Sequence, residues 1–182
     1  MKREMLLGVL LLAVAFWVFS QASGKAAPAT TPTPADGYTV HVTAPHLVNG
    51  MVMGPYHHYC KVITGDPTIV CQIYDNTDPK AIMSQVEFIW AKKLTRPDVS
   101  LARWNDLWHD HATEIAGGRV KVLDLLPDKA KEVADLIATT DGIIYSFEFD
   151  AKGVPTGKVI HAQAVGHVPM TAVDYEKSAE SK

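Results

Sequence analysis

Histidines in two short segments are the residues of this sequence best suited to chemistry. One segment contains His58, and the other contains His109 and His111, with Glu114 three residues further on. Imidazole nitrogens and carboxylate oxygens are ligands of zinc, copper and iron. These residue types therefore predict a site for one transition metal (zinc, copper or iron), and the sequence does not select among the three.

The geometry of the second segment depends on its secondary structure. On a strand, His109 and His111 would point the same way and could bind one ion together. On a helix they would diverge, and His111 would share a face with Glu114. His58, or Glu87 from a further strand, could supply another ligand. Two alternatives are buried histidines that only hydrogen-bond within the core, and a metal-free acid–base role.

No catalytic residue is predicted. The sequence contains neither a G-x-S-x-G motif nor a glycine-rich phosphate loop, and its Asp and Glu residues are dispersed. A reaction type therefore does not follow from the sequence.

Strand patterns dominate the segments that must position these residues. Runs rich in β-branched and aromatic residues predict strands at residues 38–42, 56–63, 69–74, 82–90, 119–126, 143–149 and 158–165. Turn-forming residues at 64–68 and 150–153 indicate that two pairs of these strands form antiparallel hairpins.

Two segments have helical periodicity. One runs from Asp128, its expected N-cap, to Thr139, with Gly142 near its end. The other begins at its expected N-cap, Ser100, and either ends near Trp108 or continues further along the chain. Together the patterns predict an α+β fold, a mainly antiparallel sheet built from hairpins with two packed helices.

The two cysteines lie on opposite arms of the first predicted hairpin. If its turn pairs Ile63 with Thr68, Cys60 lies directly opposite Cys71, within reach of a disulfide. An oxidising compartment would allow this bond to persist. The alternative is a pair of buried free thiols that pack as small apolar residues.

The N-terminal segment predicts export. Lys2 and Arg3 precede an uncharged apolar run of fifteen residues, 5–19, and small residues follow up to Ala22. Because a membrane-spanning helix needs about 20 such residues, we expect residues 1–22 to be a cleaved signal peptide. The alternative is an uncleaved anchor that tethers the protein to the membrane through residues 5–19. Either outcome places the protein in the periplasm or another extracytoplasmic space.

The remaining chain is expected to form one domain. Residues 23–36, rich in Ala, Thr and Pro, predict a flexible tether, residues 37–170 a single domain and residues 171–182 a polar tail. The formal net charge is −3 and the basic residues are scattered, which argues against a nucleic-acid partner. The tether leaves a second function class open, a non-enzymatic accessory protein that binds a partner or a membrane surface.

Several short motifs occur in an order typical of one known family. They are H-Y-C at 58–60, C-Q-I-Y-D at 71–75, V-E-F-I at 86–89 and L-W-H-D-H at 107–111. In these stretches the sequence resembles the oil-body-associated protein family, a domain of unknown function (DUF1264) found in plants, fungi and bacteria, over about residues 44–170. The resemblance implies a shared domain and no established activity. Tyr145 departs from the family pattern, which has a histidine there, and the export leader argues against lipid-droplet association.

Overall fold

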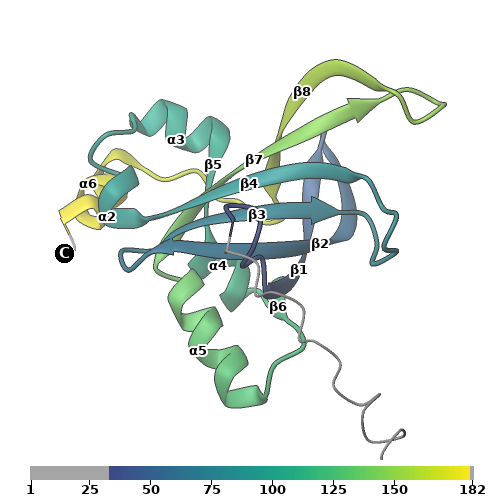
Figure 1. Ribbon diagram of the computed structural model, residues 1–182. Helices are drawn as coiled ribbons and strands as arrows, with labels where there is room; N and C mark the ends of the chain where they lie inside the picture. Colours follow the sequence, from purple (N-terminus) through teal and green to yellow (C-terminus); the bar gives the residue numbers. More distant parts are fainter. Residues whose placement is uncertain (1–32, 181–182) are drawn as a thin grey trace, which may run out of the picture. The chain divides into compact units, whose positions relative to one another are not determined.

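Six antiparallel strands form a sheet that closes on itself (Figure 1). A computed structural model describes residues 33–180, so the expected signal peptide and most of the tether lie outside the described residues. The strands follow the order β2-β3-β4-β7-β8-β1, and the ring closes because β1 also pairs with β2. Their bounds are β1 (Val40–Val48), β2 (Met51–Thr64), β3 (Thr68–Tyr74), β4 (Met83–Ala91), β7 (Thr140–Phe149) and β8 (Pro155–Ala164).

Two short strands and five helices complete the described residues. They are β5 (Trp108–Asp110), β6 (Lys121–Val122), α2 (Lys92–Thr95), α3 (Leu101–Leu107), α4 (His111–Ala116), α5 (Pro127–Ile137) and α6 (Ala172–Glu180). The predicted class is confirmed, but the expectation of two helices is wrong. Helices α2 and α4 are too short to show a helical period in the sequence. Within residues 33–180, no helix is long and apolar enough to cross a membrane.

The element ends differ from the sequence-based expectations in several places. Helix α5 begins at Pro127 with Leu126, not Asp128, as its N-cap, because the fixed φ of proline suits the first helical position. Ser100 is the N-cap of α3, but its side chain makes no capping hydrogen bond. Gly142 lies inside β7 and does not end a helix.

The segment expected to be a polar tail contains helix α6. Tyr175 of this helix is buried, and its hydroxyl donates to the carbonyl oxygen of Val99 at 2.6 Å. The Tyr175 ring also lies 5.9 Å from the ring of Trp104 in α3. These contacts fix α6 against the segment that leads into α3.

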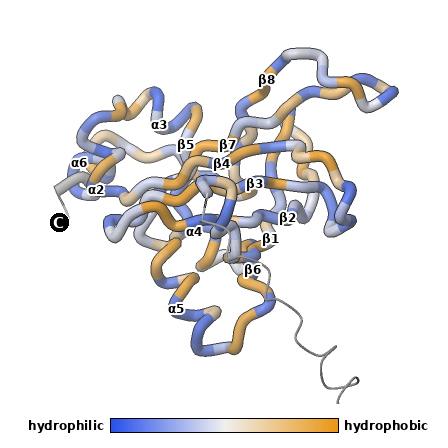
Figure 2. The backbone as a smooth tube through the Cα atoms, viewed as in Figure 1, coloured by the Kyte–Doolittle hydropathy of each residue, from blue (hydrophilic) through white to orange (hydrophobic). Residues whose placement is uncertain are grey.

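Alternate residues of the strands point into the closed sheet, and both hydrophobic and hydrophilic positions occur along the strands in Figure 2. On β3, Cys71 and Ile73 are buried, and on β4 the buried positions include Gln85, Glu87 and Ile89. A shift of one residue in register would turn Glu87 out to solvent. The strand pairing therefore determines which polar side chains lie inside.

The predicted cysteine pairing is confirmed. Cys60 lies opposite Cys71 in the β2–β3 ladder, and the two sulfur atoms form a disulfide. The turn itself differs, because a bulge after Val62 pairs Thr64 rather than Ile63 with Thr68. A disulfide in this position suggests an oxidising environment.

Removal of the disulfide should destabilise the protein. For a bond between cysteines 11 positions apart, loss of the closed loop costs about 3 kcal/mol in the chain-entropy description. We expect the Cys60→Ala/Cys71→Ala double variant to lose about this much unfolding free energy in urea, followed by tryptophan fluorescence. The wild type should lose a similar amount under a thiol reductant, to which the double variant should be insensitive. A wild type whose stability ignores the reductant would contradict this assignment.

Candidate metal centre

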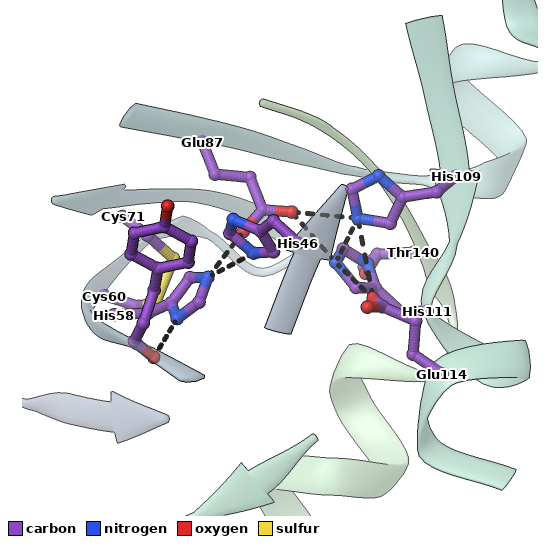
Figure 3. Close-up of a disulfide and its surroundings, with 10 residues drawn as sticks. His46, His58, Cys60, Cys71, Glu87, His109, His111, Glu114 and Thr140 are labelled. Atoms are coloured by element: carbon purple, nitrogen blue, oxygen red, sulfur yellow. Dashed lines mark hydrogen bonds and ion pairs between the residues drawn. A yellow bond between two sulfur atoms is a disulfide. The ribbon is translucent and has the colours of Figure 1, made fainter. Parts of the chain in front are cut away.

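Four histidines and two glutamates meet inside the closed sheet (Figure 3). Each is at most 4% exposed, and together they line one cavity of about 20 Å³, room for water or metal ions but for no organic molecule. They come from β1, β2, β4, β5 and α4: His46, His58, Glu87, His109, His111 and Glu114.

Glu87, His109 and His111 form the tightest part of this cluster. The Nε2 atoms of both histidines lie 3.1 Å from Oε1 of Glu87 and 3.3 Å from each other. Around a tetrahedral zinc ion with bonds of ~2.0–2.1 Å, neighbouring ligand atoms are about 3.3 Å apart. The three atoms therefore already have the spacing of ligands around one ion.

Glu114 lies beside this triad. Its Oε2 atom is 3.6 Å from Nε2 of His109 and 3.9 Å from Nε2 of His111. Its Oε1 atom has no hydrogen-bond partner among the described residues, and burial raises the pKa of this carboxyl group. A buried carboxyl oxygen without a partner is costly, and a nearby cation would relieve that cost.

The backbone changes from strand to helix between the two histidines. His109 lies in β5, whereas His111 is the first residue of α4. Asp110 caps this helix, because its Oδ1 atom accepts a hydrogen bond from the Ala112 amide at 2.7 Å. The segment is thus neither a continuous strand nor a continuous helix, and this junction brings the two imidazoles together.

A buried ion-pair network holds the junction in place. Arg96 donates to both carboxylate oxygens of Asp141, at 2.8 and 2.9 Å, and to Asp110 at 2.9 Å. Lys92 lies 2.6 Å from the other oxygen of Asp110. Burial opposes ionisation of Asp110, but Lys92 and Arg96 lower its pKa. Because Asp141 precedes Gly142, the network positions the backbone on both sides of the cluster.

Thr140 fixes a proton on Nδ1 of His111. The Thr140 hydroxyl donates to the carbonyl oxygen of Ile137 at 2.6 Å, so it accepts from Nδ1 of His111 at 2.9 Å. Nε2 is therefore the nitrogen that faces Glu87. Such a partner on the second nitrogen is typical of metal-binding histidines.

Charge within the triad is balanced without any other group. Burial alone would raise the pKa of Glu87, but hydrogen bonds from His109 and His111 hold it well below its ordinary value. Burial likewise opposes a charge on His111, yet the hydrogen bond and charge of Glu87 raise the pKa of this imidazole. In the absence of metal, Glu87 is therefore an anion paired with imidazole N–H groups.

Gly142 of β7 has no side chain, and the triad occupies the space beside it. A Cβ atom at this position would overlap Oε1 of Glu87 and lie 2.7 Å from Nε2 of His109. Any larger residue would displace one of these two side chains.

His46 and His58 form a second pair on the other side of Glu87. Their Nε2 atoms are 3.1 Å apart, and Nε2 of His58 is 3.8 Å from Oε2 of Glu87. Nδ1 of His46 lies 2.6 Å from Oε1 of Gln85, and Nδ1 of His58 lies 3.2 Å from the carbonyl oxygen of Tyr56. Burial lowers the pKa of His46 to about 3 and also lowers that of His58, so both rings are neutral near pH 7.

The structure brings together all five residues that the sequence analysis proposed as ligands, although their binding of metal stays a prediction. His46 was not predicted from the sequence, because the expected first strand ended at residue 42. In the structure β1 continues to Val48, and alternation from Val42 through Ala44 leads to His46 on the interior face. Gly142 and Thr140 were missed as well, because small residues carry no signal of a site until their neighbours are known.

Comparison with known proteins gives a family and one plant relative. A family model described as "Protein of unknown function (DUF1264)" matches residues 33–170. Oil body-associated protein 1B of Arabidopsis thaliana is 30% identical over 93 residues, which are 50% of this chain and 36% of the plant protein. The match thus spans little more than a third of that relative. No solved structure matches the chain.

Tyr145, the departure from the family pattern, does not alter the cluster. Its neighbours Ile144 and Ser146 are buried in the interior, whereas Tyr145 points the opposite way. Its ring lies 4.8 Å from that of His161 and 6.0 Å from that of Phe88, on the outer face of the sheet.

Acid should destabilise the metal-free protein through His46. The unfolded chain takes up this proton near pH 6.5, and the folded protein only near pH 3. His46 therefore leaves the free energy of unfolding unchanged above pH 6.5. Between pH 6.5 and about pH 3 it lowers that free energy by about 1.4 kcal/mol for each pH unit that the pH drops. We expect His46→Gln to show a shallower decline of unfolding free energy between about pH 6 and about pH 4, in urea with a chelator.

The matched control for this measurement is His161→Gln, which removes an exposed imidazole. Its slope should equal that of the wild type. Equal slopes for the wild type and His46→Gln would show that burial of His46 does not lower its pKa.

Proposed function

Because the chain belongs to a family of unknown function, DUF1264, we propose from the site itself that this protein binds a divalent transition-metal ion through Glu87, His109 and His111, with Glu114 as a fourth ligand. The observation that carries the proposal is the convergence of the three ligand atoms within 3.1–3.3 Å in the protein interior. Two histidines and one or two carboxylates are a ligand set for zinc and for non-haem iron.

A metal-free ion pair explains less of the geometry. A proton on His111 and a hydrogen bond from His109 would account for the short distances to Glu87. This metal-free arrangement leaves Oε1 of Glu114 buried and without a partner among the described residues. A divalent cation would be neutralised by the two carboxylates and would also give Glu114 a role, which favours the metal.

The size of the cavity limits what the site can do. About 20 Å³ accommodates water and bare metal ions but no organic substrate. A bound ion would supply Lewis acidity at this position, but the surroundings fit storage, transfer or structural binding better than catalysis on a large molecule. Binding would displace the Nε2 proton of His111, so the affinity should rise with pH.

The proposed location is the periplasm or another extracytoplasmic space. Support comes from the Cys60–Cys71 disulfide, which persists in an oxidising compartment. Further support comes from the leader-like sequence at residues 1–22, followed by a tether rich in Ala, Thr and Pro.

Zinc binding tests the proposed function. We expect the purified full-length chain, stripped with a chelator, to bind Zn²⁺ in isothermal titration calorimetry. His109→Gln and His111→Gln should each weaken the first binding step by at least about 100-fold, the upper end of the effect of groups that only orient ligands. Unchanged Zn²⁺ affinity in both variants would end the proposal.

Two further variants separate the site from general effects of substitution. Gly142→Ala keeps every ligand but fills the space beside Glu87 and His109, so it should also weaken Zn²⁺ binding. His161→Gln removes an exposed histidine and should bind as the wild type does. Circular dichroism of each variant shows whether its fold is retained.

Export is tested by the mature N-terminus. Expression of the full-length chain in a bacterial host should yield periplasmic protein whose intact mass corresponds to cleavage after Ala22. Protein found in the membrane fraction with residues 1–22 attached would favour the anchored alternative. Uncleaved protein confined to the cytoplasm would contradict export.

A further inference from the structure

We propose that His46 and His58 hold a second metal ion and that the carboxylate of Glu87 bridges it to the first. This inference rests on the proposed function, because it takes the triad of Glu87, His109 and His111 as the first site. It adds a ligand pair on different strands and makes the centre dinuclear.

The pair formed by His46 and His58 repeats the geometry of His109 and His111. The Nε2 atoms are 3.1 Å apart in one pair and 3.3 Å apart in the other. The ring centroids are separated by 4.9 and 4.8 Å, and the ring planes cross at 81° and 84°. Since the first pair has the spacing of two ligands on one ion, the second pair has it as well.

Glu87 lies between the two pairs and presents a different oxygen to each (Figure 3). Oε1 is 3.1 Å from the Nε2 atoms of His109 and His111, whereas Oε2 is 3.8 Å from Nε2 of His58. A carboxylate with one oxygen directed at each ligand set is suited to join two neighbouring ions. All these residues line the same cavity.

The partners of the Nδ1 atoms of His46 and His58 leave the Nε2 atoms of both rings free to bind metal. Nδ1 of His58 faces the carbonyl oxygen of Tyr56, which can only accept, so that nitrogen carries the proton. Nδ1 of His46 faces Oε1 of Gln85, whose amide nitrogen donates to Ser146. Both Nε2 atoms then direct lone pairs at each other across 3.1 Å, a repulsive contact that a cation would convert into two bonds.

One metal-free arrangement competes with this inference. If the amide of Gln85 were reversed, it would donate to Nδ1 of His46, and that ring could donate from Nε2 to His58. The chain of hydrogen bonds would then be complete without an ion. Metal stoichiometry distinguishes the two arrangements.

Charge predicts the order in which the two ions bind. Glu87 and Glu114 together balance one divalent ion, so a second would leave excess positive charge in a buried site. We therefore expect the second ion to bind more weakly and to bring an anion from solvent, such as hydroxide.

Titration of the chelator-treated full-length chain with Co²⁺ tests the inference. Bound metal is counted by atomic emission after gel filtration, and low-temperature electron paramagnetic resonance (EPR) reports whether the ions interact. We expect two Co²⁺ ions per wild-type chain. The EPR intensity per ion should fall when the second ion binds, because a shared carboxylate couples them.

The variants separate this inference from the proposed function. His46→Gln and His58→Gln should each bind one Co²⁺ with full EPR intensity, and the ion that remains shows that the variant is folded. His161→Gln should bind two. A wild type that binds one ion, or variants of both His46 and His58 that still bind two, would overturn the second site and leave the first intact. A wild type that binds none would overturn both.

Discussion

The charge of Glu87 is the constraint on which the interior depends. A carboxylate taken out of water is tolerated only if neighbouring groups compensate for the lost hydration. Here His109 and His111 provide that compensation, and Thr140 orients the ring of His111. The strand register places Glu87 inside, opposite Cys71 on one side and Ile144 on the other. The disulfide and the polar cluster are thus neighbours on the same sheet.

A second buried charge keeps the first one in position. Arg96 is only 4% exposed and ties Asp110, between the two histidines, to Asp141, which precedes Gly142. Such networks contribute little net stability but fix geometry, since removing one partner leaves an uncompensated charge. Ligands held on strands and locked by a supporting layer keep their spacing better than ligands on loops. The ion-pair network of Arg96, Asp110 and Asp141 therefore adds little to stability but preorganises the cluster.

Local patterns were sufficient to place most of the longer strands and to predict the pairing of Cys60 with Cys71. Both follow from the two-residue repeat of a strand. Closure of the sheet was not predictable, because it requires β1 to pair with β8, which lies far away in the sequence, as in the pairing of His46 with Ala164. The three residues of β5 are too few to show a period, so the turn between His109 and His111 was left open between two geometries. A tertiary contact, the pairing of β5 with β7, settles it.

Enclosure of the cluster by the strands has a kinetic consequence. With every proposed ligand side chain almost fully covered, an ion could enter or leave only when part of the wall opens, and such openings are rarer than the motions of surface loops. Exchange of a bound ion would then be slower than at a surface site, and its rate would report how often the wall opens.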